Sequence, residues 1–175
     1  NDSNSTVTQN AIANAKELLG TISYEEYKKL YSAYTPGATE IVVNGLDYIA
    51  DKELTTADVS ENEYDGVKAL ATGDKGVVSY KVNIPEDGMW AIMIDYWPIV
   101  DKSTSIQRIF RIDGKVPFRE AYYITLPKVW STIYDPADEH DYDGHIRYNR
   151  TDIDGNEIRG TMEQTPEWTE YSLKD

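Results

Sequence analysis

The chain has 175 residues, a length that suits one domain with a hydrophobic core. Its 31 acidic residues outnumber 17 basic ones, and the formal net charge of -14 disfavours nucleic acid and anionic membrane surfaces as partners. Cysteine is absent, which excludes disulfides, thiolate catalysis and zinc-cysteine sites. No apolar run reaches the roughly 18 residues of a membrane-spanning helix, so we expect no membrane insertion.

Two short helices are predicted near the N-terminus. Residues 8–19 place apolar side chains on one helical face, and Gly20 supplies the stop. The second helix starts at the capping-box sequence Ser23-Tyr24-Glu25-Glu26 and ends at Thr35-Pro36-Gly37. Tyrosines recur along it at helical spacing, which predicts a buried face packed on a sheet and leaves a ligand surface as the alternative.

The segment 76–118 reads as three successive antiparallel strands. Apolar and polar residues alternate in its first two runs, which are separated by a turn at Pro85-Glu86-Asp87-Gly88. The third run leads into Asp113-Gly114, a strong hairpin dipeptide because both residues tolerate positive φ. The positions expected to be buried are Val78, Tyr80, Val82, Ile84, Trp90, Ile92, Ile94, Phe110, Ile112 and Leu173.

Further strands flank this segment. We expect them at residues 41–48, 66–71, 120–130 and 168–173, with the third broken by Pro127. Residues 51–65 are predicted to form a charged loop, and residues 134–160 a long polar one. Arg147, Arg150 or Arg159 is expected to pair with the carboxylates of the long loop, without a requirement for calcium.

The alternating runs and the two turns resemble the galactose-binding-like β-sandwich of carbohydrate-binding modules. The fold expected is therefore mainly β: an antiparallel β-sandwich (jelly-roll, galactose-binding-like) with two short N-terminal helices. Residues 1–20 would form an N-terminal linker and short helix, and residues 21–175 a single β-sandwich domain with the second helix packed on it.

A more specific resemblance covers residues 27–175, which look like a domain near the N-terminus of large Gram-positive extracellular solute-binding lipoproteins of ABC sugar importers. The matching stretches are Tyr27–Tyr34, Tyr64–Ala71, Val78–Trp97, Ser105–Phe118 and Gly155–Trp168. The resemblance implies a jelly-roll-like accessory module, tethered at the cell surface, with a solute-binding domain beyond Asp175. Gly160, where a proline is expected, and the acidic segment 135–143 depart from the pattern and leave the role of this loop open.

No catalytic constellation stands out. The two histidines, His140 and His145, lie in the long loop without a recognised motif, and 31 acidic residues make any carboxylate pair uninformative. The segments 139–144 and 152–157 begin like calcium-binding EF-hand loops, yet neither has the glutamate required at position 12. We therefore expect no enzyme activity and no cofactor, with a structural calcium ion as the alternative.

The remaining candidates for a binding site are exposed aromatic side chains. Fourteen tyrosines and four tryptophans against two phenylalanines favour half-exposed aromatic surfaces, on which the C–H face of a sugar can stack. Trp97 and Trp130 lie where strands become loops, and the predicted ligand-binding set is Trp97, Trp130, Tyr96 and Tyr122. Trp90 and Trp168 alternate with core positions and are expected to be buried.

The leading hypothesis is a non-catalytic carbohydrate-binding or accessory module of an extracellular solute-binding protein, at the surface of a Gram-positive bacterium. A structural module that docks a transport domain is the first alternative. A small β-sandwich enzyme acting on carbohydrates is the second.

Overall fold

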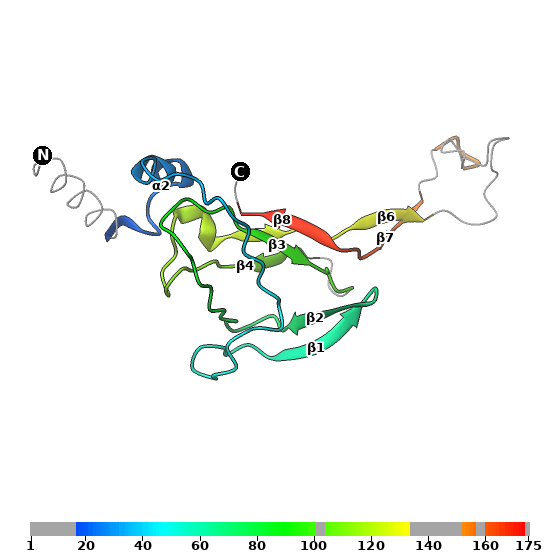
Figure 1. Cartoon of the computed structure of the whole chain (residues 1–175). Helices are drawn as coiled ribbons and strands as arrows, with labels where there is room; N and C mark the ends of the chain where they lie inside the picture. Colours follow the sequence, from blue (N-terminus) through cyan, green and yellow to red (C-terminus); the bar gives the residue numbers. More distant parts are fainter. Residues whose placement is uncertain (1–16, 101–103, 134–151, 157–159, 174–175) are drawn as a thin grey trace, which may run out of the picture. The chain divides into compact units, whose positions relative to one another are not determined.

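The computed structural model describes residues 17–100, 104–133, 152–156 and 160–173 (Figure 1). These residues cluster into two compact units, which we describe separately. Unit 1 holds the described residues 25–91, and unit 2 holds the described residues 17–24 and 92–173. Every strand pair described is antiparallel, which confirms the mainly β class predicted from sequence. Within the described ranges, no helix has the length and apolarity of a membrane span.

Unit 1 is built on a β-hairpin. Strands β1 (Val59–Tyr64) and β2 (Val67–Thr72) pair over their full length. The chain turns at Asp65 and Gly66, whose φ values of 50° and 75° are those of a type I′ turn. Residues 66–71 were expected to be a strand, and they are one with a shift of one residue. The loop expected at 51–65 is wrong in its second half, because that half forms β1.

Helix α2 (Tyr24–Leu30) is shorter than the sequence predicts, because Leu30 rather than Tyr34 is its last residue. None of its residues is fully buried, so the prediction of a buried tyrosine face is wrong. Tyr27 instead contacts Tyr31, which follows the helix, with ring centroids 4.8 Å apart, and Tyr31 contacts Tyr34 at 6.1 Å. Burial of its ring raises the pKa of Tyr27, and the neighbouring Tyr31 adds to this.

The strand expected at residues 76–84 does not form. Tyr80 makes an isolated bridge to Tyr48, which is also all that remains of the strand expected at 41–48. The Val77 carbonyl accepts bonds from the N–H groups of Thr56 and Ala57, so an irregular loop takes the hydrogen bonds that a neighbouring strand would need. Tyr80, Val82 and Ile84 are consequently exposed, contrary to prediction.

The described residues of unit 2 form three short two-stranded sheets, and one of them pairs strands that are far apart in the chain (Figure 1). Strand β3 (Met93–Tyr96) pairs with β8 (Thr169–Ser172), β4 (Ile106–Arg108) with β5 (Ile124–Leu126), and β6 (Trp130–Ile133) with β7 (Thr161–Gln164). The predicted three-stranded meander is therefore wrong. The last predicted strand is confirmed as β8, and the segment 120–130 divides between a 3₁₀ helix, η1 (Arg119–Tyr122), and the strands β5 and β6.

The predicted hairpin turn at Asp113-Gly114 is confirmed. The two residues have φ values of 49° and 75°, and Ile112 and Lys115 exchange backbone hydrogen bonds of 2.8 and 2.9 Å. Ile112 itself is exposed, contrary to prediction, whereas Leu173 is buried as expected. Five other predicted core positions are partly buried: Val78, Trp90, Ile92, Ile94 and Phe110.

The core of the described chain lies in unit 2. Its buried apolar residues are Val116, Phe118, Ala121, Ile124, Leu126 and Leu173. They come from the segment before η1, from η1 and β5, and from the residue after β8. The N-terminal part of unit 2 joins them, because Gly20 N–H donates to Pro117 and Arg119 N–H donates to Ile22.

Several predictions lie outside the described residues. The first helix is described only at Glu17 and Leu18, which are helical, and Gly20 follows with a φ of 82°, which fits a stop there. The three arginines expected to pair in the long loop are not described, and neither histidine is. Of that loop, Asp152–Asn156 forms a turn in which the Asp152 carboxylate accepts the N–H groups of Asp154 and Asn156.

Candidate functional site

Unit 2 has an open cleft of about 450 Å³, which we call the Tyr123 cleft. Its apolar floor consists of Phe118, Ile124 and Leu173, all buried. Its polar and aromatic lining consists of Arg119, Glu120, Tyr123 and Tyr171. The volume lies in the range of small-ligand sites, which commonly combine an apolar floor with a few convergent polar groups.

The 3₁₀ helix η1 positions this lining. Ala121 is fully buried, and its carbonyl accepts the Phe110 N–H at 2.9 Å. Because η1 is anchored there, the flanking residues Arg119, Glu120 and Tyr123 are carried to the surface around the cleft. Tyr123 is 80% exposed. An aromatic residue of a unit that has a core is usually less exposed, because burial of its ring is favourable.

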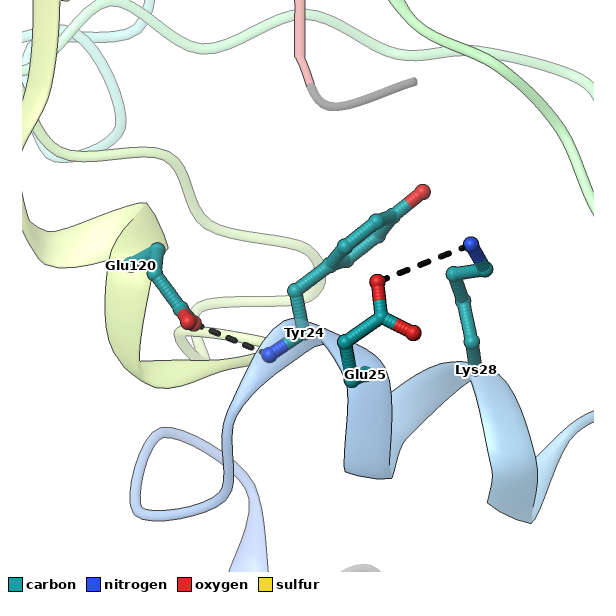
Figure 2. Close-up of polar contacts among 4 residues, drawn as sticks. All are labelled: Tyr24, Glu25, Lys28 and Glu120. Atoms are coloured by element: carbon teal, nitrogen blue, oxygen red, sulfur yellow. Dashed lines mark hydrogen bonds and ion pairs between the residues drawn. The ribbon is translucent and has the colours of Figure 1, made fainter.

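Glu120 is fixed by a long-range contact. One of its carboxylate oxygens accepts the backbone N–H of Tyr24 at 2.9 Å, at the start of α2 (Figure 2). This bond satisfies one of the N–H groups that a helix N-terminus leaves without an internal partner. The Tyr24 ring also meets the Phe118 ring edge-on, with centroids 5.0 Å apart. The ion pair between Lys28 and Glu25 in the same figure is an exposed contact of 3.7 Å within α2, with little effect on stability.

Strand β8 and the residue after it supply the last two lining residues. Tyr171 and Leu173 are two positions apart, so alternation along the strand directs them to one face. The Leu173 N–H donates to Ile92 at 2.9 Å, which continues the β3–β8 pairing past the last residue of the strand. The cleft thus depends on pairing between residues almost 80 positions apart in the sequence.

None of the four predicted ligand-binding residues lines the Tyr123 cleft. Tyr96 and Trp97 lie at the end of β3, where the Tyr96 hydroxyl donates to the Pro127 carbonyl at 2.7 Å. Burial raises the pKa of Tyr96, against a smaller lowering by a bond with Thr169. The Trp97 ring meets Trp168 edge-on at 5.8 Å, and both are partly buried.

The other two predicted residues lie elsewhere in unit 2. Trp130 begins β6, opposite Gln164 on β7, and is partly exposed. Tyr122 belongs to η1 and lines a second cleft, described below. The structure therefore brings Trp97 into contact with Trp168, whereas Tyr122 lines a separate cleft and Trp130 lies on β6.

Sequence reasoning missed Arg119, Glu120, Tyr123 and Tyr171. For Tyr171 a signal was present, since it stands two residues before the predicted core residue Leu173 in the same strand. For Tyr123 the sequence contains no such signal, because it does not reveal that a 3₁₀ helix interrupts the predicted strand at 120–130. Among the residues that the structure describes, no group of three or more His, Asp or Glu side chains is placed to hold a metal ion.

Comparisons with protein-family models, with curated proteins and with solved structures found no match to this chain.

Proposed function

We propose that this chain is a non-catalytic carbohydrate-binding or accessory module of an extracellular solute-binding protein for sugar uptake, and that the sugar binds in the Tyr123 cleft. The observation that carries the proposal is the exposed Tyr123 ring beside an apolar floor, with a guanidinium and a carboxylate in the same lining. Sugars are recognised by such a combination, because their ring faces are apolar and their edges carry hydroxyl groups.

Each lining residue has a role in this proposal. The C–H face of a pyranose stacks on Tyr123, with Tyr171 as a second aromatic contact. The Arg119 guanidinium donates to sugar hydroxyl oxygens, and the Glu120 carboxylate accepts from hydroxyl groups. The bond from Tyr24 holds Glu120 in place before the sugar arrives, so less side-chain entropy is lost on binding.

The finer fold is part of the proposal. Pairing between β3 and β8, from distant parts of the sequence, is typical of sandwich folds and supports the galactose-binding-like jelly roll. The resemblance to Gram-positive solute-binding lipoproteins supports a place at the cell surface and a solute-binding domain as neighbour. The domain boundaries 1–20 and 21–175 and the ligand roles of Trp97, Trp130, Tyr96 and Tyr122 stay predictions.

The test is calorimetry and a glycan array with the 175-residue chain. We expect a glycan to bind and Tyr123→Ala to weaken it at least tenfold, as loss of a stacked aromatic contact of about 1.5 kcal/mol requires. Tyr34→Ala removes an exposed tyrosine from unit 1 and should leave the affinity unchanged. If no plant, host or microbial glycan bound, the proposal would be contradicted. If Trp97→Ala weakened glycan binding and Tyr123→Ala did not, the site would lie at the residues predicted from sequence.

A docking role is the second candidate, because unit 1 exposes many apolar side chains. Val42 is 83% exposed, and Leu54, Val67, Val82 and Ile84 are also exposed. Contiguous patches of exposed apolar side chains mark interaction sites in many proteins. Under this alternative, Val42→Ser with Ile84→Ser would weaken association with the neighbouring solute-binding domain, and Tyr123→Ala would not alter sugar capture. Release of reducing ends from a polysaccharide panel would instead indicate the enzyme alternative.

A further inference from the structure

A second cleft in unit 2, of about 700 Å³, carries basic side chains. We call it the Arg111 cleft. Arg111, Lys115 and Tyr122 line it together with Glu17, so two cations face one carboxylate and leave one excess positive charge. This sign is opposite to that of the chain as a whole, whose net charge is -14. A local excess of cations in an acidic protein attracts anionic groups despite the overall field.

The two cations are held by a rigid turn. Arg111 precedes Ile112, and Lys115 exchanges two backbone hydrogen bonds with Ile112 across the Asp113-Gly114 turn. The backbone beneath both side chains is therefore fixed. Among the residues that the structure describes, neither Arg111 nor Lys115 forms an ion pair. Within the part of the chain that the structure describes, both charges are therefore available to a ligand.

The Tyr122 ring is fixed beside them. It lies directly on the backbone of Gly20, where an added Cβ would come within 3.2 Å of the Tyr122 hydroxyl oxygen and 3.3 Å of a ring carbon. Gly20 also has a φ of 82°, which disfavours any side chain there. Tyr122 is nevertheless 41% exposed, so part of the anchored ring is left for a ligand.

We propose that the Arg111 cleft binds the carboxylate of an acidic sugar, such as a uronic acid residue of a glycan. The inference rests on the proposed carbohydrate function and names a substrate class for it. Arg111 binds the carboxylate through its planar fork, Lys115 adds a point charge, and the pyranose ring lies against Tyr122. A single excess positive charge matches a monoanionic carboxylate better than a dianionic phosphate. A phosphate ion also has no ring that could stack on Tyr122.

The test compares the binding of three ligands to the 175-residue chain: oligogalacturonate, the neutral galactose oligosaccharide of equal length, and inorganic phosphate. We expect calorimetry to show tighter binding of oligogalacturonate, which Arg111→Gln weakens about tenfold or more because a charge-assisted bond is lost. Lys115→Gln should weaken it by a smaller factor. Lys52→Gln, which removes an exposed lysine of unit 1, is the matched control and should leave it unchanged.

The outcomes separate this inference from the proposed function. Equal affinity for the acidic and the neutral oligosaccharide, or equal losses in Lys115→Gln and Lys52→Gln, would overturn the acidic-sugar assignment while binding at the Tyr123 cleft still stood. Phosphate that binds as tightly as oligogalacturonate, with the same sensitivity to Arg111→Gln, would also overturn it. Failure of every glycan to bind would remove the proposed function together with this inference.

Discussion

The two units differ in what holds them together. Every buried apolar residue of the described chain lies in unit 2, whereas the buried residue of unit 1 is Thr55, which is polar. Unit 2 sequesters apolar surface around η1 and β5. Unit 1 relies on the β1–β2 hairpin and on bonds such as that from Ser79 N–H to the Thr55 hydroxyl, at 3.1 Å. The alternating run at residues 78–84 is thus mostly exposed in unit 1, whereas unit 2 has a core.

The largest expected effect is that of Phe118→Ala. Phe118 is 5% exposed and packs against Tyr24, so its removal leaves a cavity in the core of unit 2. We expect a loss of about 3–5 kcal/mol in the free energy of unfolding, measured by urea titration with tryptophan fluorescence. Ile84→Ala in unit 1 is the matched change at a side chain that is 51% exposed, and it should cost about 0.5 kcal/mol or less. Equal losses for the two variants would remove the distinction between the units.

A smaller effect is expected for Thr55→Val. The substitution keeps the shape of the side chain and removes the acceptor of the Ser79 N–H. A buried donor without a partner costs about 1–3 kcal/mol, which urea titration will resolve. Thr56 makes the same kind of bond, to the Val77 N–H at 3.1 Å, but is exposed, so Thr56→Val should cost less because water replaces the hydroxyl. If Thr56→Val were the more damaging change, buried hydrogen bonding would not explain unit 1.

The smallest effect concerns the turn at Asp152. Bonds from the Asn156 side chain, and then from backbone N–H groups, lower the Asp152 pKa below 3.8. Its stabilising contribution is therefore complete above pH 3.8 and is lost as the pH falls through the lower, folded pKa. We expect the amide signals of Asp154 and Asn156 to shift in NMR spectra with a midpoint below that pH. Asp152→Asn keeps an acceptor that does not titrate and should abolish the shift; a midpoint at or above pH 3.8 would contradict the assignment.

Turns can be predicted from sequence because the backbone conformation of a turn depends on the few residues within it. Asp113-Gly114 was predicted and forms, since aspartate and glycine accept the positive φ that a type I′ turn imposes. Asp65-Gly66 has the same dipeptide and the same positive φ, and it joins β1 to β2 although residues 51–65 are predicted to form a loop. The strands at 67–72 and 169–172 were also predicted, each to within one residue, because alternation and β-branched residues suit a paired strand.

The sequence by itself determined the mainly β class, the hairpin turn at Asp113-Gly114 and the richness in half-exposed aromatics. The tertiary structure alone decided which alternating runs were covered, so that Leu173 is buried and Val82 is exposed. It also decided that Glu120 meets Tyr24 and that Tyr123, rather than Trp97, lines the cleft with β8. The physical reason is that alternation fixes which side chains share a face, while burial and site geometry depend on pairing between distant segments.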